Sequence, residues 1–293
     1  MAVLADRFRV EKVHTKRTGH ATELARQAAT AAAEVVTVLG GDGTVNEAVN
    51  GLVGTSVPLA IVPGGGADVF ARSAGIPKDP VAAASMLTAH AISPDRLRRV
   101  PLGRVLSPAF PNGQTSRYFV ANCGVGFDAA IVRAVESRPR VKRRLGDRYF
   151  VAVGLRLFFG RGFDRRRPHV ELAWGTSEGE RKEGLFLAII QNTTPFTYLG
   201  RRAIRLCPEA RLDAGLDCFA VDTMRTRTIL PIVASAFGSG RRAYGSHVTY
   251  VRDQTDFRIR CDQPLPAQMD GEYVGEHTDL AVTSVSGALP MVC

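Results

Sequence analysis

Residues 35–53, VVTVLGGDGTVNEAVNGLV, place three glycines and an aspartate between an apolar run and a helical pattern. The short β-branched run that ends at Leu39 is typical of a strand buried on both faces of a parallel sheet. Apolar residues then recur with helical spacing at Val45, Ala48, Val49 and Leu52. We therefore predict a strand, a glycine turn and a helix in this order.

Gly40, Gly41 and Gly43 lie in the predicted turn. Glycine lets a ligand approach the main chain closely, and the first N–H groups of a helix favour a phosphate. Asp42 would repel a phosphate unless a hard cation such as Mg²⁺ joins the two. An ordinary corner would also use glycine with an Asp or Thr cap, but GGDGT after a buried strand favours a nucleotide-phosphate site.

A second glycine turn follows the same logic in residues 58–77, PLAIVPGGGADVFARSAGIP, with a strand at 59–62 and a helix at 67–74. Turns at the carboxyl ends of parallel strands share one sheet edge, where open α/β sheets bind ligands. Upstream, FRVEKVHTKR at 8–17 alternates like a strand, and HATELARQAATAAA at 20–33 is a strong helical pattern. Residues 1–97 are thus predicted to form an α/β nucleotide-binding domain.

Beyond residue 97, short alternating runs separated by turn residues replace this pattern. They predict an antiparallel β-rich domain over residues 98–276, with one long helical insertion from about 129 to 159. Residues 277–293 are again strand-like and could pair with either domain.

The composition is that of a globular protein, with 45% hydrophobic and 23% charged residues in a chain of 293. No apolar run is long enough for a membrane-spanning helix, and the first residues lack the features of a signal peptide. Five scattered cysteines without CxxC spacing indicate reduced thiols. We therefore expect a cytoplasmic protein.

The net charge of +10 suits an anionic nucleotide, an anionic membrane or nucleic acid. Basic charge is concentrated in residues 137–169, where the apolar stretch Tyr149–Phe159 lies between arginine-rich flanks. Two interpretations stay open: an amphipathic segment resting on anionic headgroups, or a core helix with solvated arginine ends. No nucleic-acid-binding signature occurs, so nucleic acid is not an expected partner.

Five motifs resemble, in order and approximate spacing, those of bacterial diacylglycerol kinase-like lipid kinases, relatives of sphingosine kinase. They are TKRTGHATELA (15–25), GGDGTVNEAVNGL (40–52), PGGGADVFARSAGIP (63–77), YFVANCGVGFDA (118–129) and MDGEYVGE (269–276). The resemblance covers nearly the whole chain. It implies an α/β domain of the NAD kinase and diacylglycerol kinase type, a C-terminal antiparallel β-sandwich domain, and a last strand, 277–293, that returns toward the first domain.

The same resemblance implies transfer of the γ-phosphate of Mg-ATP to a lipid hydroxyl, of diacylglycerol or a related acceptor, in phospholipid biosynthesis. The enzyme would be cytoplasmic and peripheral to an anionic membrane surface that holds its lipid acceptor.

By this resemblance three acids carry the chemistry. Asp270 matches the general base that takes the proton from the acceptor hydroxyl, Glu272 supports it, and Asp42 belongs to the metal network. A positioned general base contributes about 10²- to 10⁴-fold in rate. The residues expected to contact ATP and Mg²⁺ are Thr15, Gly40, Gly41, Asp42, Gly43, Thr44, Val45, Asn46, Gly65 and Gly66.

The chain departs from the family pattern in its first half. The family's first strand, with its Asn-Pro turn, is missing, and whether the authentic start lies upstream stays open. Gly66 stands for a threonine, Asp68 for an asparagine and Val69 for an aspartate, and Pro101 replaces another aspartate. Two acids of the magnesium network are therefore lost, and Asp68 is the candidate to substitute in part.

A structural metal of the family is also doubtful in this chain. The resemblance places its ligands at Arg211, Ala214 and the carbonyl of Leu216. Arginine and alanine cannot supply carboxylates, so we do not expect the metal to be held in the same way. Asp213 and Asp217 lie nearby at the wrong spacing and are interpreted as turn acids.

Three other polar residues each have two interpretations. His20 would touch a phosphate or, with Thr22, cap the following helix. Asn122 and Asp128 flank a glycine pair, and would shape the acceptor channel or serve a strand-to-helix turn.

Two alternative functions remain. An NAD kinase shares GGDGT, although NEAVNGL and the later DGE argue against it. A non-catalytic lipid- or nucleotide-binding protein would explain the missing strand and the lost acids. The acyl chains of the acceptor stay open, because an apolar channel discriminates weakly between chain lengths. The oligomeric state, a homodimer included, stays open as well.

Overall fold

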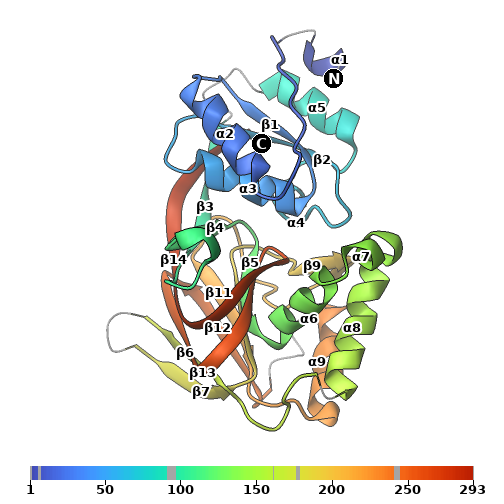
Figure 1. Ribbon diagram of the computed structural model, residues 1–293, viewed down its shortest axis with the longest axis vertical. Coiled ribbons are helices and arrows are strands. Elements are labelled where there is room, and N and C mark those ends of the chain that lie inside the picture. Colours follow the sequence, from blue (N-terminus) through green and yellow to red (C-terminus); the bar gives the residue numbers. More distant parts are fainter. Residues whose placement is uncertain are drawn as a thin grey trace. The chain divides into compact units, whose positions relative to one another are not determined.

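The chain forms two compact units (Figure 1). The computed structural model describes residues 2–5, 8–90, 97–160, 162–175, 179–240 and 245–292. Unit 1 contains residues Met1–Leu102 and Val285–Cys293, and unit 2 contains Gly103–Ser284. Arg161 of the predicted arginine-rich flank and Cys293 lie outside the described residues.

Unit 1 is an α/β unit around a parallel strand pair. Strands β1 (Val36–Gly40) and β2 (Leu59–Pro63) pair in parallel, and Met291 of β14 pairs with Leu59 on the other side of β2. All five residues of β2 are buried, as expected for a strand covered on both faces. The helices are α1 (Ala2–Ala5), α2 (His20–Thr30), α3 (Asp42–Leu52), α4 (Val69–Ser73) and α5 (Pro80–His90).

The strand predicted at residues 8–17 is wrong. Residues 9–16 belong to no helix or strand and are exposed, including Val10 and Val13. A strand needs a neighbour to pair its N–H and C=O groups. Within the described residues β1 is the last strand on its side of the sheet, and none pairs with residues 8–16. The alternating pattern is therefore present without the partner that would make it a strand.

Unit 2 is rich in antiparallel strands. Its strands follow the order β14-β13-β5-β8-β11-β12, and β6 and β7 continue from another part of β13. The bounds are β3 (Leu97–Leu106), β4 (Ser116–Phe119), β5 (Asn122–Gly126), β6 (Val170–Trp174), β7 (Arg181–Leu185), β8 (Leu187–Gln191), β9 (Thr197–Leu199), β10 (Arg202–Ile204), β11 (Leu216–Val221), β12 (Val248–Gln254), β13 (Asp256–Met269) and β14 (Glu272–Val292).

A break in the long strand β13 divides this sheet into two halves. The register with β14 shifts between Arg260 and Leu265, and β6 pairs with β13 before the shift while β5 pairs after it. Side chains of both halves, such as Leu172 of β6 and Ile190 of β8, share one buried core. The fold class predicted from the sequence, an α/β unit followed by an antiparallel β-sandwich, is therefore confirmed.

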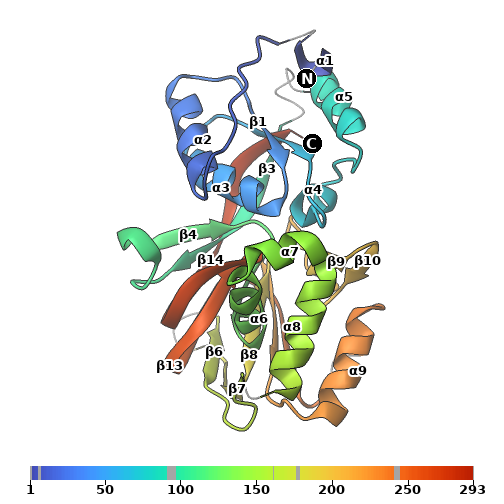
Figure 2. The ribbon, with the colours of Figure 1, turned by 45° about the vertical axis from the view of Figure 1, so that its right-hand side comes forward.

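The helical insertion of unit 2 is three helices instead of one. These are α6 (Phe127–Glu136), α7 (Pro139–Leu145) and α8 (Asp147–Phe159), separated at Pro139 and at Gly146. A fourth helix, α9 (Thr226–Ala236), was not predicted, and Figure 2 shows it beside α8. None of the helices in the described part of the chain is long and apolar enough to cross a membrane.

Candidate functional site

Two glycine turns adjoin in unit 1. Because Gly40 pairs with Pro63 in the parallel register, both turns leave the sheet at the same level. The Gly64 N–H donates to the carbonyl oxygen of Gly40 at 3.0 Å. A Cβ atom placed on Gly65 would lie only 2.7 Å from the Cα atom of Gly41. Glycine at position 65 is therefore required by contact between the turns.

Gly43 and Gly66 have no such structural reason. A Cβ atom on either would meet no other atom within 4 Å, and neither has a left-handed backbone. Both are exposed. Helix α3 also begins without a side-chain cap at Gly41, which leaves N–H groups of its first turn for a ligand. These features fit a phosphate that approaches the main chain closely.

The two acids of these turns differ in how they are held. Asp42 is half-buried, and its Oδ1 accepts the Phe70 N–H at 3.3 Å. Asp68 is buried with a left-handed φ of 46°, and its Oδ1 accepts the Gly65 N–H at 2.9 Å. Asp68 therefore stabilises its own turn, which weakens its candidacy as a substitute for the lost acids.

The site fits a magnesium ion that arrives with the nucleotide. Mg²⁺ is commonly bound by one or two carboxylates together with substrate phosphates, and Asp42 lies at the start of the uncapped helix. Within the described residues no group of three or more His, Cys, Asp or Glu side chains could hold a metal ion by itself.

The other residues predicted to contact the nucleotide differ in their exposure. Val45 is 3% exposed and Asn46 is 1% exposed, so both side chains lie in the interior of unit 1. Asn46 contacts Asn50, whose Nδ2 donates to its Oδ1 at 3.2 Å. Thr44 is half-buried next to Gly40, and Thr15 is exposed in the segment without regular structure. Only the backbone of residues 45 and 46 remains for a ligand.

Two residues further along the motif at 40–52, Glu47 and Gly51, hold α2 against α3. The Glu47 carboxylate accepts the N–H groups of Gly19 at 2.8 Å and Ala21 at 3.0 Å, at the start of α2. A Cβ atom on Gly51 would lie 2.4 Å from the carbonyl oxygen of Thr22. Neither role was predicted from the sequence. His20, for which two interpretations were open, accepts the N–H of Lys16 at its Nδ1.

In unit 2, Asp270 occupies the turn between β13 and β14 with a left-handed φ of 50°. Its Oδ2 accepts the Val120 N–H at 2.8 Å, and its Oδ1 accepts those of Ala121 at 2.8 Å and Asn122 at 2.9 Å. Three backbone donors fix the orientation of this carboxylate and stabilise its negative charge. This geometry goes well beyond what an ordinary β-turn requires.

A buried hydrogen-bond network joins the turn that contains Asp270 to the motif at residues 118–129. Gln268 Nε2 donates to Asn122 Oδ1 at 2.8 Å and to Asp128 Oδ2 at 3.1 Å, and its Oε1 accepts the Gly271 N–H at 2.9 Å. Burial raises the pKa of Asp128 to about 7. Its Oδ1 is shielded from solvent and has no hydrogen-bond partner among the residues described. A Cβ atom on Gly124 would overlap Asp128, at 2.1 Å.

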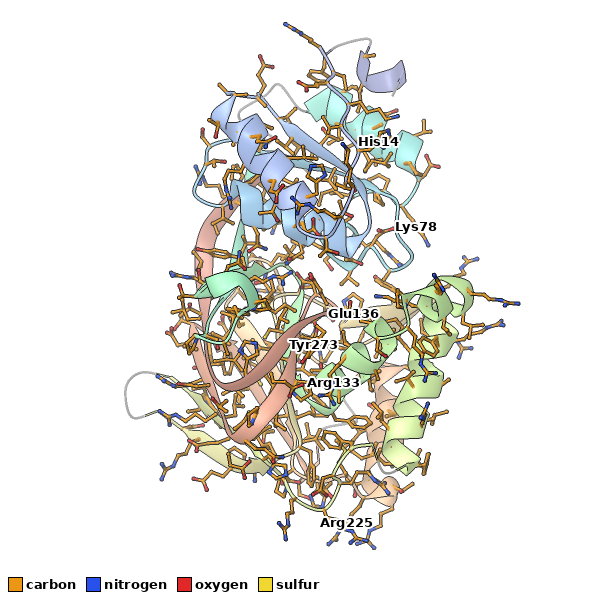
Figure 3. All side chains as sticks on the ribbon, in the orientation of Figure 1. His14, Lys78, Arg133, Glu136, Arg225 and Tyr273 are labelled. Carbon is orange, nitrogen blue, oxygen red and sulfur yellow. The ribbon has the colours of Figure 1, made fainter. Side chains whose placement is uncertain are left out.

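The residues just after Asp270 are held by neighbouring elements of unit 2. The Glu272 carboxylate pairs with Arg117 of β4. The next residue, Tyr273, donates its N–H to Glu136 Oε2 at 3.0 Å. Figure 3 shows Glu136 and Arg133 of α6 close to Tyr273. Strand β4 and helix α6 thus hold the start of β14 from two directions, and the sequence analysis named neither Arg117 nor Glu136.

The acids near the doubtful structural metal have structural partners. Arg211 pairs with Asp213 at 3.2 Å on the surface. Asp217 is buried in β11, where Tyr250 Oη donates to its Oδ2 at 2.6 Å and the Asp253 N–H donates to its Oδ1 at 3.0 Å. Asp217 therefore joins β11 to β12.

Comparison with known proteins shows which proteins this chain resembles. Residues 2–100 match the model of the diacylglycerol kinase catalytic domain. The chain is 25% identical over 260 residues to a diacylglycerol kinase of Bacillus subtilis, covering 88% of this chain and 77% of that protein. It is 29% identical over 265 residues to a "Probable lipid kinase YegS-like" of Pseudomonas putida, with the same two coverages.

The fold matches solved structures of the same family. A diacylglycerol kinase structure from Bacillus anthracis superimposes with a TM-score of 0.63 at 21% identity, over 96% of this chain and 83% of that one. The resemblance drawn from the sequence is confirmed: residues 2–100 match the diacylglycerol kinase catalytic domain, and over most of its length the chain is similar to bacterial diacylglycerol kinase-like lipid kinases.

Proposed function

We propose that the protein is an ATP-dependent lipid kinase that transfers the γ-phosphate to the hydroxyl group of diacylglycerol or a related acceptor. The observation that carries the proposal is the pair of glycines, Gly43 and Gly66, that neither packing nor backbone conformation explains. Gly43 lies in the first turn of α3, and Gly66 lies in the glycine turn that adjoins the uncapped start of this helix, an arrangement that favours a nucleotide phosphate.

In unit 1 the N–H groups at the start of α3 would bind the phosphates of ATP and orient the γ-phosphate. Asp42 would hold Mg²⁺, which offsets the negative charge of the phosphates. Glu47 would act indirectly. Its carboxylate fixes α2 against α3, the helix that supplies these donors.

In unit 2 Asp270 would accept the proton of the acceptor hydroxyl, which makes that oxygen a stronger nucleophile. The three backbone donors hold its carboxylate in one orientation, so little reorganisation is needed at the moment of transfer. Glu272, paired with Arg117, would keep the turn in place.

The acceptor is a membrane lipid in this proposal, so the enzyme works peripherally on an anionic membrane at its cytoplasmic side. The net charge of +10 supports this setting. NAD kinase activity and non-catalytic binding are the alternatives that the experiment must separate.

The test is transfer of labelled γ-phosphate from ATP, with products resolved by thin-layer chromatography. One reaction contains a mixed lipid extract and a second contains NAD⁺, each with and without Mg²⁺. Label in a lipid that depends on Mg²⁺ supports the proposal and begins to name the acceptor. Label in NAD⁺ alone, or nucleotide binding without any transfer, overturns it.

A further inference from the structure

Helix α9 exposes an apolar face. Its eleven residues, TRTILPIVASA, carry one charge, that of Arg227. Leu230 is 55% exposed, Val233 is 46% exposed and Phe237, just past the helix, is 37% exposed. A surface helix of a globular domain normally turns charged residues to solvent. Contiguous exposed apolar residues mark an interaction surface.

Helix α8 carries a similar stripe. Val151, Leu155 and Phe159 recur every four residues and are 44%, 53% and 60% exposed. This spacing places them on one face of the helix. Arg148 and Arg156 are exposed on the same side. The outer face of α8 therefore combines apolar side chains with arginines.

The two stripes belong to one surface. Phe158 of α8 and Ile232 of α9 are buried in the same hydrophobic cluster, so both helices cover it from outside. Figures 1 and 2 both show α8 and α9 side by side. We call the six exposed apolar residues the α8–α9 surface: Val151, Leu155, Phe159, Leu230, Val233 and Phe237.

An arginine-lined hollow of about 770 Å³ adjoins this surface. Four of its lining residues are Arg165, Arg166, Arg225 and Arg227. The guanidinium of Arg165 lies 4.6 Å from the centre of the Phe158 ring, which places the hollow at the end of α8. Arg225 and Arg227 flank the first residue of α9. Figure 3 shows Arg225 at the lower end of the view.

One acid also lines the hollow, and a lysine offsets its charge. Asp222 pairs with Lys182 at 3.5 Å, and its Oδ1 is hydrogen-bonded to His247 Nδ1 at 2.8 Å. Guanidinium groups bind phosphate oxygens in a bidentate manner. The hollow therefore has the chemistry of a phosphate-binding site next to an apolar surface.

We propose that the α8–α9 surface and the arginine hollow seat the protein on an anionic phospholipid bilayer. The apolar side chains enter the interface between headgroups and acyl chains, and the arginines bind headgroup phosphates. Helix α8 contains Arg148 and Arg156 beside one acid, Asp147, and the one charged residue of α9 is Arg227, so the two helices together carry a positive net charge. Like charges oppose contact between two copies of the chain and favour an anionic membrane.

This inference rests on the proposed function only in the choice of a membrane lipid as acceptor. It is tested by co-sedimentation with vesicles in the absence of nucleotide, so failure of either proposal leaves the other result standing. One set of vesicles contains phosphatidylcholine and phosphatidylglycerol in equal parts, and the other contains phosphatidylcholine alone.

Two double variants probe the two components. Arg225→Gln with Arg227→Gln is expected to weaken binding to anionic vesicles about 30-fold at low salt and to reduce its salt dependence. Leu230→Ser with Val233→Ser is expected to weaken it about tenfold. The control, Arg181→Gln with Arg211→Gln, removes the same charge from exposed positions elsewhere in unit 2.

Binding that falls in both double variants and stays within about twofold of wild type in the control supports the proposal. Equal binding to neutral and anionic vesicles, or unchanged binding in both variants, overturns it. Sedimentation velocity adds a third outcome. A wild-type dimer that Leu230→Ser with Val233→Ser converts to monomer, with vesicle binding unchanged, would make the surface an interface between copies and refute membrane seating. Thermal midpoints equal to wild type show that the variants are folded.

Discussion

The glycine turns separate residues required for packing from residues required for a ligand, and two alanine substitutions test this division. At Gly65 a new Cβ atom would lie 2.7 Å from both Gly41 Cα and Asp68 Oδ1. The Gly41 neighbour is backbone and cannot move aside cheaply. At Gly66 the same atom would enter open space, and the backbone there is not left-handed.

The two substitutions should affect the free energy of unfolding differently. Overpacking costs about 1–3 kcal/mol, and the loss of glycine freedom in the unfolded chain returns about 0.4–1 kcal/mol. Gly65→Ala should therefore lower the free energy of unfolding by about 1.3 kcal/mol, the difference between the midpoints of the two ranges. Gly66→Ala should leave it unchanged or raise it by up to about 1 kcal/mol.

The affinity for ATP should fall in Gly66→Ala, the variant whose stability is not lowered. A methyl group at residue 66 occupies the space in which a phosphate would approach the main chain. Loss of one charged hydrogen bond corresponds to about 1.5 kcal/mol, or about a tenfold weaker Kd for ATP. Urea unfolding followed by circular dichroism and ATP titration calorimetry give the two readouts.

Either of two results would refute this reasoning. One is a Gly65→Ala variant as stable as wild type, which would mean that the turns do not pack as described. The other is a Gly66→Ala variant that loses stability but keeps its ATP affinity, which would assign Gly66 to packing.

Two further predictions concern residues that hold the site. Glu47→Gln should lower the free energy of unfolding, measured in urea, by about 1–2 kcal/mol, because two N–H groups lose an ionised acceptor. The control Glu34→Gln, at an exposed position, should change it little. Equal stability of the two variants would contradict the capping role of Glu47. Burial raises the pKa of Asp128 from 3.8 to about 7, so the folded state holds this proton more tightly and the free energy of unfolding should fall as pH rises through that window. Asp128→Asn should remove that fall in urea unfolding measured across the same pH range, and an unchanged fall would assign it to another group.

The local parts of the site were predictable from the sequence. The run that ends at Leu39, the glycine turn and the helical spacing after Asp42 are decided by neighbours in the chain, and the structure has all three. The strand predicted at 8–17 shows the limit of such reasoning. Alternation indicates that a segment suits a sheet, but pairing requires a partner strand that the pattern does not reveal.

Contacts between distant residues could not be predicted in this way. The N–H groups that hold the Asp270 carboxylate belong to residues 120–122, far from Asp270 in the sequence, and only the fold brings them to the turn. Glu47 received no role from the sequence, while its partners at 19 and 21 assign it a capping role. Helix α9 was not predicted, and it contains Pro231 in its interior, a residue that in a sequence indicates the end or a kink of a helix.

The most direct test of the central claim is the rate of labelled phosphate transfer from ATP to diacylglycerol in mixed micelles by wild type, Asp270→Asn and Asp213→Asn. Asp213 is an exposed acid of the same unit and serves as the matched control. The amide introduced by Asp270→Asn would leave one of the three backbone donors without an acceptor, so ATP affinity and thermal midpoint are measured beside the rate. We predict that kcat falls about 10²- to 10⁴-fold in Asp270→Asn alone, with ATP affinity within about twofold of wild type. A folded Asp270→Asn variant that transfers phosphate at the wild-type rate, or a wild type that labels no lipid, would contradict it.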